Sequence, residues 1–214
     1  MPESTPSDTP SSRTELRRRA FLDAARDVFL QQGYDTANMS EIVKRAGGSM
    51  ATLYTQFGDK QGLFLAVLEA GVSEFADAFD LELQNHAPIR EDLVRIGEQF
   101  ASALVQPASI EMYRLIISLG RKFPDITTSF LQRGPLRMRV ALGRYLEERA
   151  AASAVSIRDS EALAALFLDM IRSGLQTRSL LDPSFKPTKA DVREHVERAV
   201  DIFLLGVASQ SQSD

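Results

Sequence analysis

The sequence predicts an all-α fold of about nine helices, and three observations favour it. Apolar residues recur with the period of a helix almost everywhere, while alternating, strand-like runs are absent. Glycine and proline separate these periodic segments at helix-length intervals. Hydrophobic residues make up 44% and charged residues 25% of the chain, a composition typical of a globular protein. We therefore expect a compact N-terminal unit of three helices followed by a larger helical body.

The first expected helix begins at a capping signal and ends at a glycine. Ser12 stands three residues before Glu15, which is the spacing of a reciprocal capping box, and Gly33 supplies a left-handed C-cap. Asn38 and Glu41 repeat the capping spacing, so we expect them to open a short second helix.

Glycines and a serine separate the next helices. Gly47 and Gly48 end the second helix, and Ser49 is a favourable N-cap for a short third one. Gly58 breaks the third helix, and Asp59 caps a long fourth helix that runs into the eighties.

Prolines divide the rest of the chain into further helices. We expect helices at about 89–105, 109–123, 135–152, 159–181 and 188–208, with a short amphipathic piece at 124–131. The expected organisation is a disordered tail at 1–12, a head at 13–58, a C-terminal regulatory and dimerisation domain at 59–209, and a second disordered tail at 210–214.

The composition excludes several classes of site. The chain has no Cys, which rules out disulfides and cysteine-based metal sites or nucleophiles, and with only His86 and His195 a zinc site is not expected. No stretch approaches the length of a membrane span, and the N-terminus lacks the apolar core of a signal peptide, so we expect a cytoplasmic protein. No nucleotide-binding or nucleophile-elbow motif is present and the acidic residues are spread over polar faces; we expect no catalysis, metal or cofactor.

The segment 38–57 has the local features of a DNA-reading helix-turn-helix. Such a motif needs a supporting helix, a tight turn and a second helix whose N-terminal end enters the major groove. The turn glycines permit a steep crossing, and Leu53 and Phe57 anchor the third helix while its other face presents small or polar groups. Residues 13–60 carry eight Lys or Arg against six Asp or Glu, and residues 61–214 carry 17 against 21. A mildly basic head suits contact with phosphates, but ordinary charge scatter would give the same counts.

The same segment and its flanks resemble the TetR family of transcriptional regulators. The match covers about 15–75 without gaps and rests on Arg19-Ala20-Phe21-Leu22-Asp23-Ala24-Ala25, Phe29…Gly33-Tyr34, Asn38-Met39-Ser40-Glu41-Ile42, Ala46-Gly47 and Thr52-Leu53-Tyr54…Phe57…Lys60…Leu63. The body resembles an AefR-like subgroup at Glu111-Met112-Tyr113-Arg114-Leu115-Ile116…Phe123-Pro124 and Phe130…Gly134-Pro135. The resemblance implies a homodimeric, ligand-responsive repressor whose two heads bind a palindromic double-stranded DNA operator.

The resemblance also implies roles for individual residues. Tyr54 and Lys60 match positions that usually grip phosphates, and Met50, Ala51 and Gln56 occupy base-facing positions. The full set of expected DNA contacts is Thr36, Asn38, Ser49, Met50, Ala51, Thr52, Tyr54, Thr55, Gln56 and Lys60.

Three positions depart from the family pattern. Met50 stands where Lys or Arg is frequent, which favours an apolar contact over a guanine contact. Gly48 replaces the usual Val of the turn, so we expect looser packing between the two short helices. Ala37 replaces a frequent phosphate-binding Thr, with Thr36 beside it as the expected substitute.

Two further sets of residues are expected in the body. In the family the last two helices pair with those of a second subunit, which implies a dimer interface at Phe167, Met170, Ile171, Gly174, Val196, Phe203 and Leu204; plain intramolecular core would produce the same apolar stripes. A cavity for a small apolar or amphipathic effector is expected among helices four to seven, lined by Phe64, Val67, Met112, Tyr113, Ile116 and Phe130, although each residue could instead be core. The alternative function is a helical dimeric scaffold or sensor that has lost DNA binding.

Overall fold

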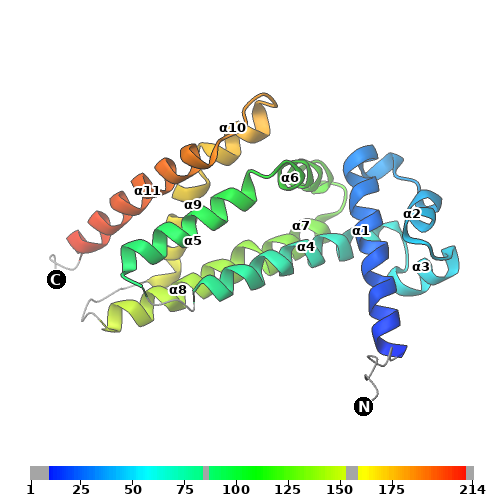
Figure 1. The fold of residues 1–214 in the computed structure, drawn as a ribbon, viewed down its shortest axis with the longest axis horizontal. Helices are drawn as coiled ribbons and strands as arrows, with labels where there is room; N and C mark the ends of the chain where they lie inside the picture. Colours follow the sequence, from blue (N-terminus) through cyan, green and yellow to red (C-terminus); the bar gives the residue numbers. More distant parts are fainter. Residues whose placement is uncertain (1–9, 84–86, 153–158, 211–214) are drawn as a thin grey trace, which may run out of the picture. The chain divides into compact units, whose positions relative to one another are not determined.

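The computed structural model describes residues 10–83, 87–152 and 159–210 (Figure 1). This part of the chain folds entirely into helices, eleven in all, with no strand. They are α1 (Pro10–Thr36), α2 (Met39–Ala46), α3 (Met50–Phe57), α4 (Lys60–Glu82), α5 (Ile89–Leu104), α6 (Pro107–Leu119), α7 (Pro124–Arg133), α8 (Pro135–Ala152), α9 (Ser160–Arg172), α10 (Leu175–Leu181) and α11 (Lys189–Gln210). The all-α prediction is confirmed.

Two features raise the helix number above the predicted nine. The amphipathic piece expected at 124–131 is a helix of ten residues, α7. The helix expected at 159–181 is interrupted, because Ser173 is extended and Gly174 adopts a φ of 75° and a ψ of −63°, and α10 starts anew at Leu175. A positive φ is accessible to glycine at little cost, so Gly174 permits this break.

The structure describes only a small part of the two tails predicted at 1–12 and 210–214. Helix α1 begins at Pro10, slightly before the expected start at Ser12, and the non-helical φ of 75° at Gly33 marks the predicted stop within the α1 range. Residues 1–9 and 211–214, which make up most of both expected tails, lie outside the described residues, as does His86. Among the helices that are described, none is both long enough and apolar enough to cross a membrane.

The chain divides into two compact units, Met1–Gly71 and Val72–Asp214. The first unit therefore extends beyond Gly58, where the expected head ends. The reason is that the first turns of α4 belong to its core: the Phe64 ring lies 5.0 Å from that of Phe29 and 5.3 Å from that of Tyr34, in edge-to-face contacts.

The second unit is built around the packing of α5 on α11 and of α8 on α9. Its core includes Phe79, Leu93, Phe167 and Val196, all fully buried. One charged group lies inside this core. The carboxylate of Asp92 is completely buried, and it accepts hydrogen bonds from the Tyr145 hydroxyl at 2.7 Å and from Nη2 of Arg95 at 2.8 Å.

Candidate nucleic-acid interface

Helix α2 starts from an N-cap that differs in part from the predicted one. The Asn38 side chain accepts a hydrogen bond from the N–H of Ser40 at 2.8 Å, so Asn38 is the N-cap. Glu41 does not bond back to Asn38. Its carboxylate instead accepts from Nε2 of Gln32 at 2.6 Å and pairs with Arg45, and these hydrogen bonds hold the pKa of Glu41 below its usual value, that from Gln32 having the larger effect. The reciprocal capping box predicted for this helix is therefore wrong.

The turn between α2 and α3 is tight and closely packed. Gly47 has a φ of 69° and a ψ of 36°, a left-handed conformation that ends α2 where the sequence predicts. The looser packing expected from Gly48 is wrong. A Cβ atom at this position would lie 2.3 Å from Cζ of Phe21, so the buried Phe21 ring already fills the space in which a larger residue would place its side chain.

Helix α3 is capped and anchored as its sequence predicts. Ser49 is extended and its hydroxyl accepts from the N–H of Thr52 at 3.1 Å. Leu53 and Phe57 are buried. Among the predicted DNA contacts on this helix, Ala51, Tyr54 and Thr55 are exposed, with Tyr54 at 45%, whereas Met50, Thr52 and Gln56 are half-buried.

Several hydroxyls predicted to contact phosphates are bonded within the chain. The hydroxyl oxygens of Ser49 and Thr52 lie 2.8 Å apart, and Thr36 donates to the carbonyl oxygen of Gln32. A hydroxyl that donates in this way still has oxygen lone pairs, but phosphate oxygens require a donor. Only one of the Ser49 and Thr52 hydroxyls can donate in their mutual contact, so the other keeps a donor for phosphates. The exposed Tyr54 and Thr55 are the other hydroxyls of this segment that can donate to phosphates.

Lys60 lies at the first position of α4, and its ammonium group hydrogen-bonds to the backbone just before α2. Nζ of Lys60 donates to the carbonyl oxygens of Asp35 at 3.0 Å and Ala37 at 2.8 Å, and it lies 5.3 Å from the centroid of the Tyr34 ring. Burial, followed by the nearby carboxylates of Asp59 and Asp35, raises the pKa of Tyr34, so that ring stays neutral beneath the cation. This structural role of Lys60 was not predicted from the sequence, because the carbonyl groups that it bonds lie over twenty residues away along the chain.

Two arginines of α1 lie against the helix-turn-helix and were also missed. Nη1 of Arg17 donates to the carbonyl oxygens of Ala46, at 3.3 Å, and Gly47, at the end of α2. The guanidinium of Arg18 lies 4.8 Å from the centroid of the Phe57 ring. The run of three arginines at 17–19 was the available sequence signal.

The predicted effector residues do not form one cluster. Phe64 and Val67 are buried in the first unit, where Phe64 packs on Phe29 and Tyr34. In the second unit the rings of Tyr113 and Phe130 lie 5.9 Å apart, Met112 is half-buried, and Ile116 is buried.

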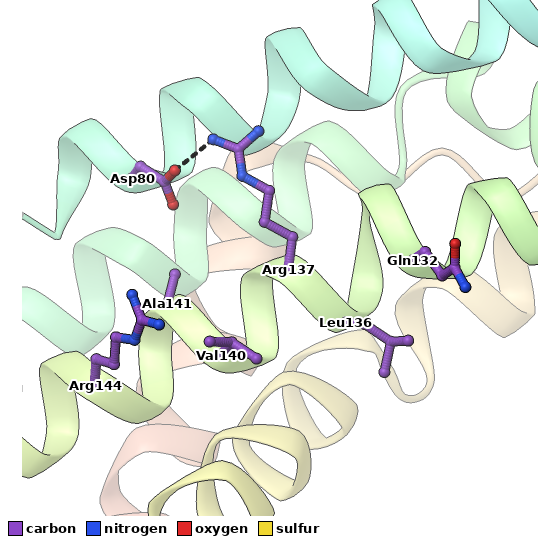
Figure 2. A pocket seen from close by; sticks show the side chains of 7 residues that line it. All are labelled: Asp80, Gln132, Leu136, Arg137, Val140, Ala141 and Arg144. Atoms are coloured by element: carbon purple, nitrogen blue, oxygen red, sulfur yellow. Dashed lines mark hydrogen bonds and ion pairs between the residues drawn. The ribbon is translucent and has the colours of Figure 1, made fainter.

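A hollow of about 360 Å³ lies on the second unit, between α4 and α8. Its lining includes none of the six predicted effector residues. Figure 2 shows Leu136, Val140 and Arg144 along α8, with Arg137 of the same helix reaching toward Asp80 of α4. The seven lining residues are Asp80, Gln132, Leu136, Arg137, Val140, Ala141 and Arg144.

The predicted dimer interface needs correction. Phe167, Ile171, Val196 and Phe203 are buried in the core of this single chain, between 0% and 6% exposed, so they offer no surface to a second subunit. The two possibilities left open by the sequence are thus resolved in favour of core for these four residues. Among the other three, Met170 and Leu204 are half-buried and Gly174 is exposed. The exposed large apolar residues described on α9 and α11 are Leu166, Ile202 and Leu205.

The geometry of 38–57, a supporting helix, a left-handed glycine turn and an anchored helix with an exposed small and polar face, defines a DNA-binding helix-turn-helix protein. Two family models match the chain: bacterial regulatory proteins of the tetR family over residues 21–67, and the C-terminal domain of AefR-like transcriptional repressors over residues 91–206. The chain belongs to the TetR family of transcriptional regulators.

Individual relatives agree with this assignment. The repressor ComR of Escherichia coli is 28% identical over 163 residues, which cover 74% of this chain and 77% of that protein. The activator FasR of Mycolicibacterium smegmatis is 36% identical over 100 residues, covering 47% of this chain and 45% of that protein.

Solved structures show the same fold. A TetR-family regulator from Mesorhizobium loti gives a TM-score of 0.85 at 23% identity, over 90% of this chain and 97% of that one. The flavonoid-responsive regulator FrrA gives 0.71 at 25% identity, over 89% and 96%. Bacillus subtilis FadR, solved in complex with stearoyl-CoA, gives 0.63 at 18% identity, over 86% and 96%.

Proposed function

We propose that this protein is a ligand-responsive repressor that binds a palindromic operator as a homodimer. The observation that carries the proposal is the anchored helix α3, whose buried Leu53 and Phe57 hold an exposed face of small and polar groups at a tight turn. The repressor assignment is supported by the match to the AefR-like repressor domain and by the named relative ComR.

The operator contacts follow from the exposure of α3. The exposed Ala51 faces base edges, with the half-buried Met50 and Gln56 beside it, and these uncharged groups favour apolar contacts such as that of a thymine methyl. The hydroxyl groups of Tyr54 and Thr55 donate hydrogen bonds to phosphate oxygens. These contacts set the register of the helix on the duplex without distinguishing base sequence. Two such helices in a dimer must lie about 34–36 Å apart to enter successive major grooves.

The experiment that tests DNA recognition is selection of bound fragments from the source genome, followed by titration of the enriched fragment. An Ala51→Asp variant places a negative charge on the exposed face of α3 and is expected to lose the operator, because the carboxylate repels phosphates. Ala190→Asp is the matched control, since Ala190 is also an exposed alanine at the second position of a helix, α11. Equal affinity of Ala51→Asp and the control would contradict the proposed interface.

The dimer interface proposed here differs from the one predicted. Phe167 of α9 and Phe203 of α11 contact each other at 5.1 Å, so the exposed neighbours Leu166 and Ile202 lie on adjoining helices near that contact. Leu205, one turn beyond Ile202, is 73% exposed. Burying these leucines and isoleucine against a second copy removes exposed apolar side chains from water.

Sedimentation of a Leu205→Asp variant tests this interface. The variant is expected to be monomeric at micromolar concentration while keeping its helix content, because the substituted side chain contributes little to the core. Leu81→Asp is the control, since Leu81 is 64% exposed but lies on α4. A dimer that survives Leu205→Asp as well as it survives the control would rule out this surface.

The effector is proposed to be a small amphipathic molecule bound in the second unit. FrrA is described as flavonoid-responsive and FadR was solved with stearoyl-CoA, which supports a ligand with a large apolar part. Binding releases the operator only if the ligand prefers the geometry that does not bind DNA. A panel of flavonoids and acyl-CoA thioesters, scored by operator release in the titration above, tests this class; failure of every amphipathic compound to shift the operator Kd would count against it.

A further inference from the structure

The recognition helix carries no charge of its own. The eight residues of α3 are Met, Ala, Thr, Leu, Tyr, Thr, Gln and Phe. Affinity for duplex DNA depends strongly on cations that neutralise phosphates and release their counterions. Lys60 at the start of α4 is bonded to the carbonyl oxygens of Asp35 and Ala37. A cation held at the turn by another element can supply this charge beside α3.

Arg17 of α1 is held at this turn. Its Nη1 donates to the carbonyl oxygens of Ala46 and Gly47, and it lies 3.7 Å from the point where a Cβ of Gly47 would be. Gly47 is two residues before Ser49, the N-cap of α3. The anchoring contacts fix a side chain that would otherwise sample many rotamers, so less entropy is lost when it meets a ligand.

The anchoring leaves most of the guanidinium available. A guanidinium has five N–H donors that point outward along different edges of one plane, and the contacts with Ala46 and Gly47 use the Nη1 edge alone. Among the residues that the structure describes, Nε and Nη2 of Arg17 have no hydrogen-bond or ion-pair partner, and the side chain is exposed. This is the donor pattern that suits a phosphate, which takes parallel bonds from two N–H groups.

We propose that Arg17 is a DNA phosphate contact, a cation that α1 supplies at the turn before the uncharged α3. The partner is the sugar–phosphate backbone of duplex DNA. The inference rests on the proposed function for its biological setting, but the contact itself is independent of base sequence, since phosphates carry no sequence information.

The salt dependence of DNA binding tests the contact. Wild-type protein, Arg17→Gln and Arg26→Gln are titrated with the selected operator and with a random duplex from about 50 to 200 mM salt. Glutamine can still donate to the turn carbonyls but has lost the charge. The slope of log K against log salt is expected to become shallower by about 0.9 for each Arg17 that contacts DNA, with similar weakening on both duplexes.

Arg26→Gln is the matched control. It removes one positive charge from the same helix, but Arg26 lies near Asp23 and Asp27, at 3.6 and 3.8 Å, so its slope is expected to equal that of wild type. Arg17→Lys, which keeps the charge and a donor for the turn, is expected to retain the wild-type slope. Thermal melting by circular dichroism checks that each variant is folded.

The outcomes separate the two claims. The Arg17 contact would be overturned if the salt slope of Arg17→Gln equals that of wild type, or if Arg17→Gln and Arg26→Gln change the slope equally. It would also be overturned if a folded Arg17→Lys variant shows the same slope as Arg17→Gln. Binding of the random duplex suffices for this comparison. The proposed function fails separately, if wild-type protein shows no preference for any selected fragment over the random duplex.

Discussion

Replacing Tyr145 with phenylalanine is expected to destabilise the second unit, because it removes a donor from a buried carboxylate. Asp92 is completely buried, Tyr145 is 4% exposed, and the hydroxyl donates to Oδ2 of Asp92 at 2.7 Å. Arg95 holds only the other oxygen, at 2.8 Å, and it is itself paired with Glu82. Tyr145→Phe keeps the ring and removes the hydrogen bond that the buried Oδ2 of Asp92 accepts.

The magnitude follows from the charge of the acceptor. A hydrogen bond to a charged group contributes roughly 1.5–3 kcal/mol, and leaving the partner buried and unsatisfied puts the cost within that range. A loss of about 2 kcal/mol multiplies the unfolding equilibrium constant by roughly 30 and lowers the Tm by about 4–8 °C for a chain of this size.

Urea unfolding followed by circular dichroism measures the loss. Tyr113→Phe is the control, because Tyr113 is a half-buried tyrosine of the same unit for which no hydroxyl hydrogen bond occurs among the described residues. The control is expected to stay within about 0.5 kcal/mol of wild type. If Tyr145→Phe loses no more than the control, the hydroxyl does not support Asp92 and the reasoning is refuted.

The same tyrosine makes stability depend on alkaline pH. Burial, and then the hydrogen bond and charge of Asp92, raise the pKa of Tyr145 above its ordinary value. The folded state therefore keeps a proton that the unfolded chain releases near pH 10, so this contribution is complete below about pH 10 and declines as the pH rises further. The stability difference between wild type and Tyr145→Phe is expected to shrink between about pH 9 and pH 11; a constant difference would contradict the assigned pKa shift.

Two further predictions concern the first unit. Gly48→Ala is expected to lower the free energy of unfolding by roughly 1–3 kcal/mol, because its Cβ would lie 2.3 Å from Cζ of Phe21. Gly71→Ala, whose Cβ would have no neighbouring atom within 4 Å, is expected to raise it by roughly 0.5–1 kcal/mol. Comparing their unfolding midpoints checks both, and a stabilised Gly48→Ala would contradict the packing described. Lys60→Met is expected to lose about 1 kcal/mol and to speed amide exchange around Ala37, since Nζ no longer holds that carbonyl. Unchanged exchange there would leave phosphate binding as the role of Lys60.

Local chemistry made part of this structure predictable from sequence. Ser49 caps α3, Gly47 ends α2, and Asp59 accepts the N–H of Gly62 at 2.7 Å at the start of α4, all as expected, because each depends on residues within one turn. Glu41 departed from its expected role because Gln32, a residue of α1, takes its carboxylate. The residue spacing around Glu41 gives no sign that Gln32 of another helix hydrogen-bonds to its carboxylate.

Burial was harder to predict than helix formation. Phe167 and Phe203 form apolar stripes whether the covering element is another helix of the chain or a second subunit, and periodicity alone does not separate the two. The break at Gly174 was missed for a related reason: the apolar pattern continues through it, and a single glycine inside a helical pattern is usually tolerated.

The lack of charge on α3 has a consequence for how the protein searches a chromosome. Non-specific attraction to DNA comes from phosphate neutralisation, so a helix without cations adds little to binding at random sites. In the proposed interface, α3 discriminates between sequences by shape and apolar fit to base edges, which salt hardly weakens. Because the proposed phosphate contacts weaken equally on both kinds of DNA, we expect the ratio of operator affinity to random affinity to stay nearly constant as ionic strength changes.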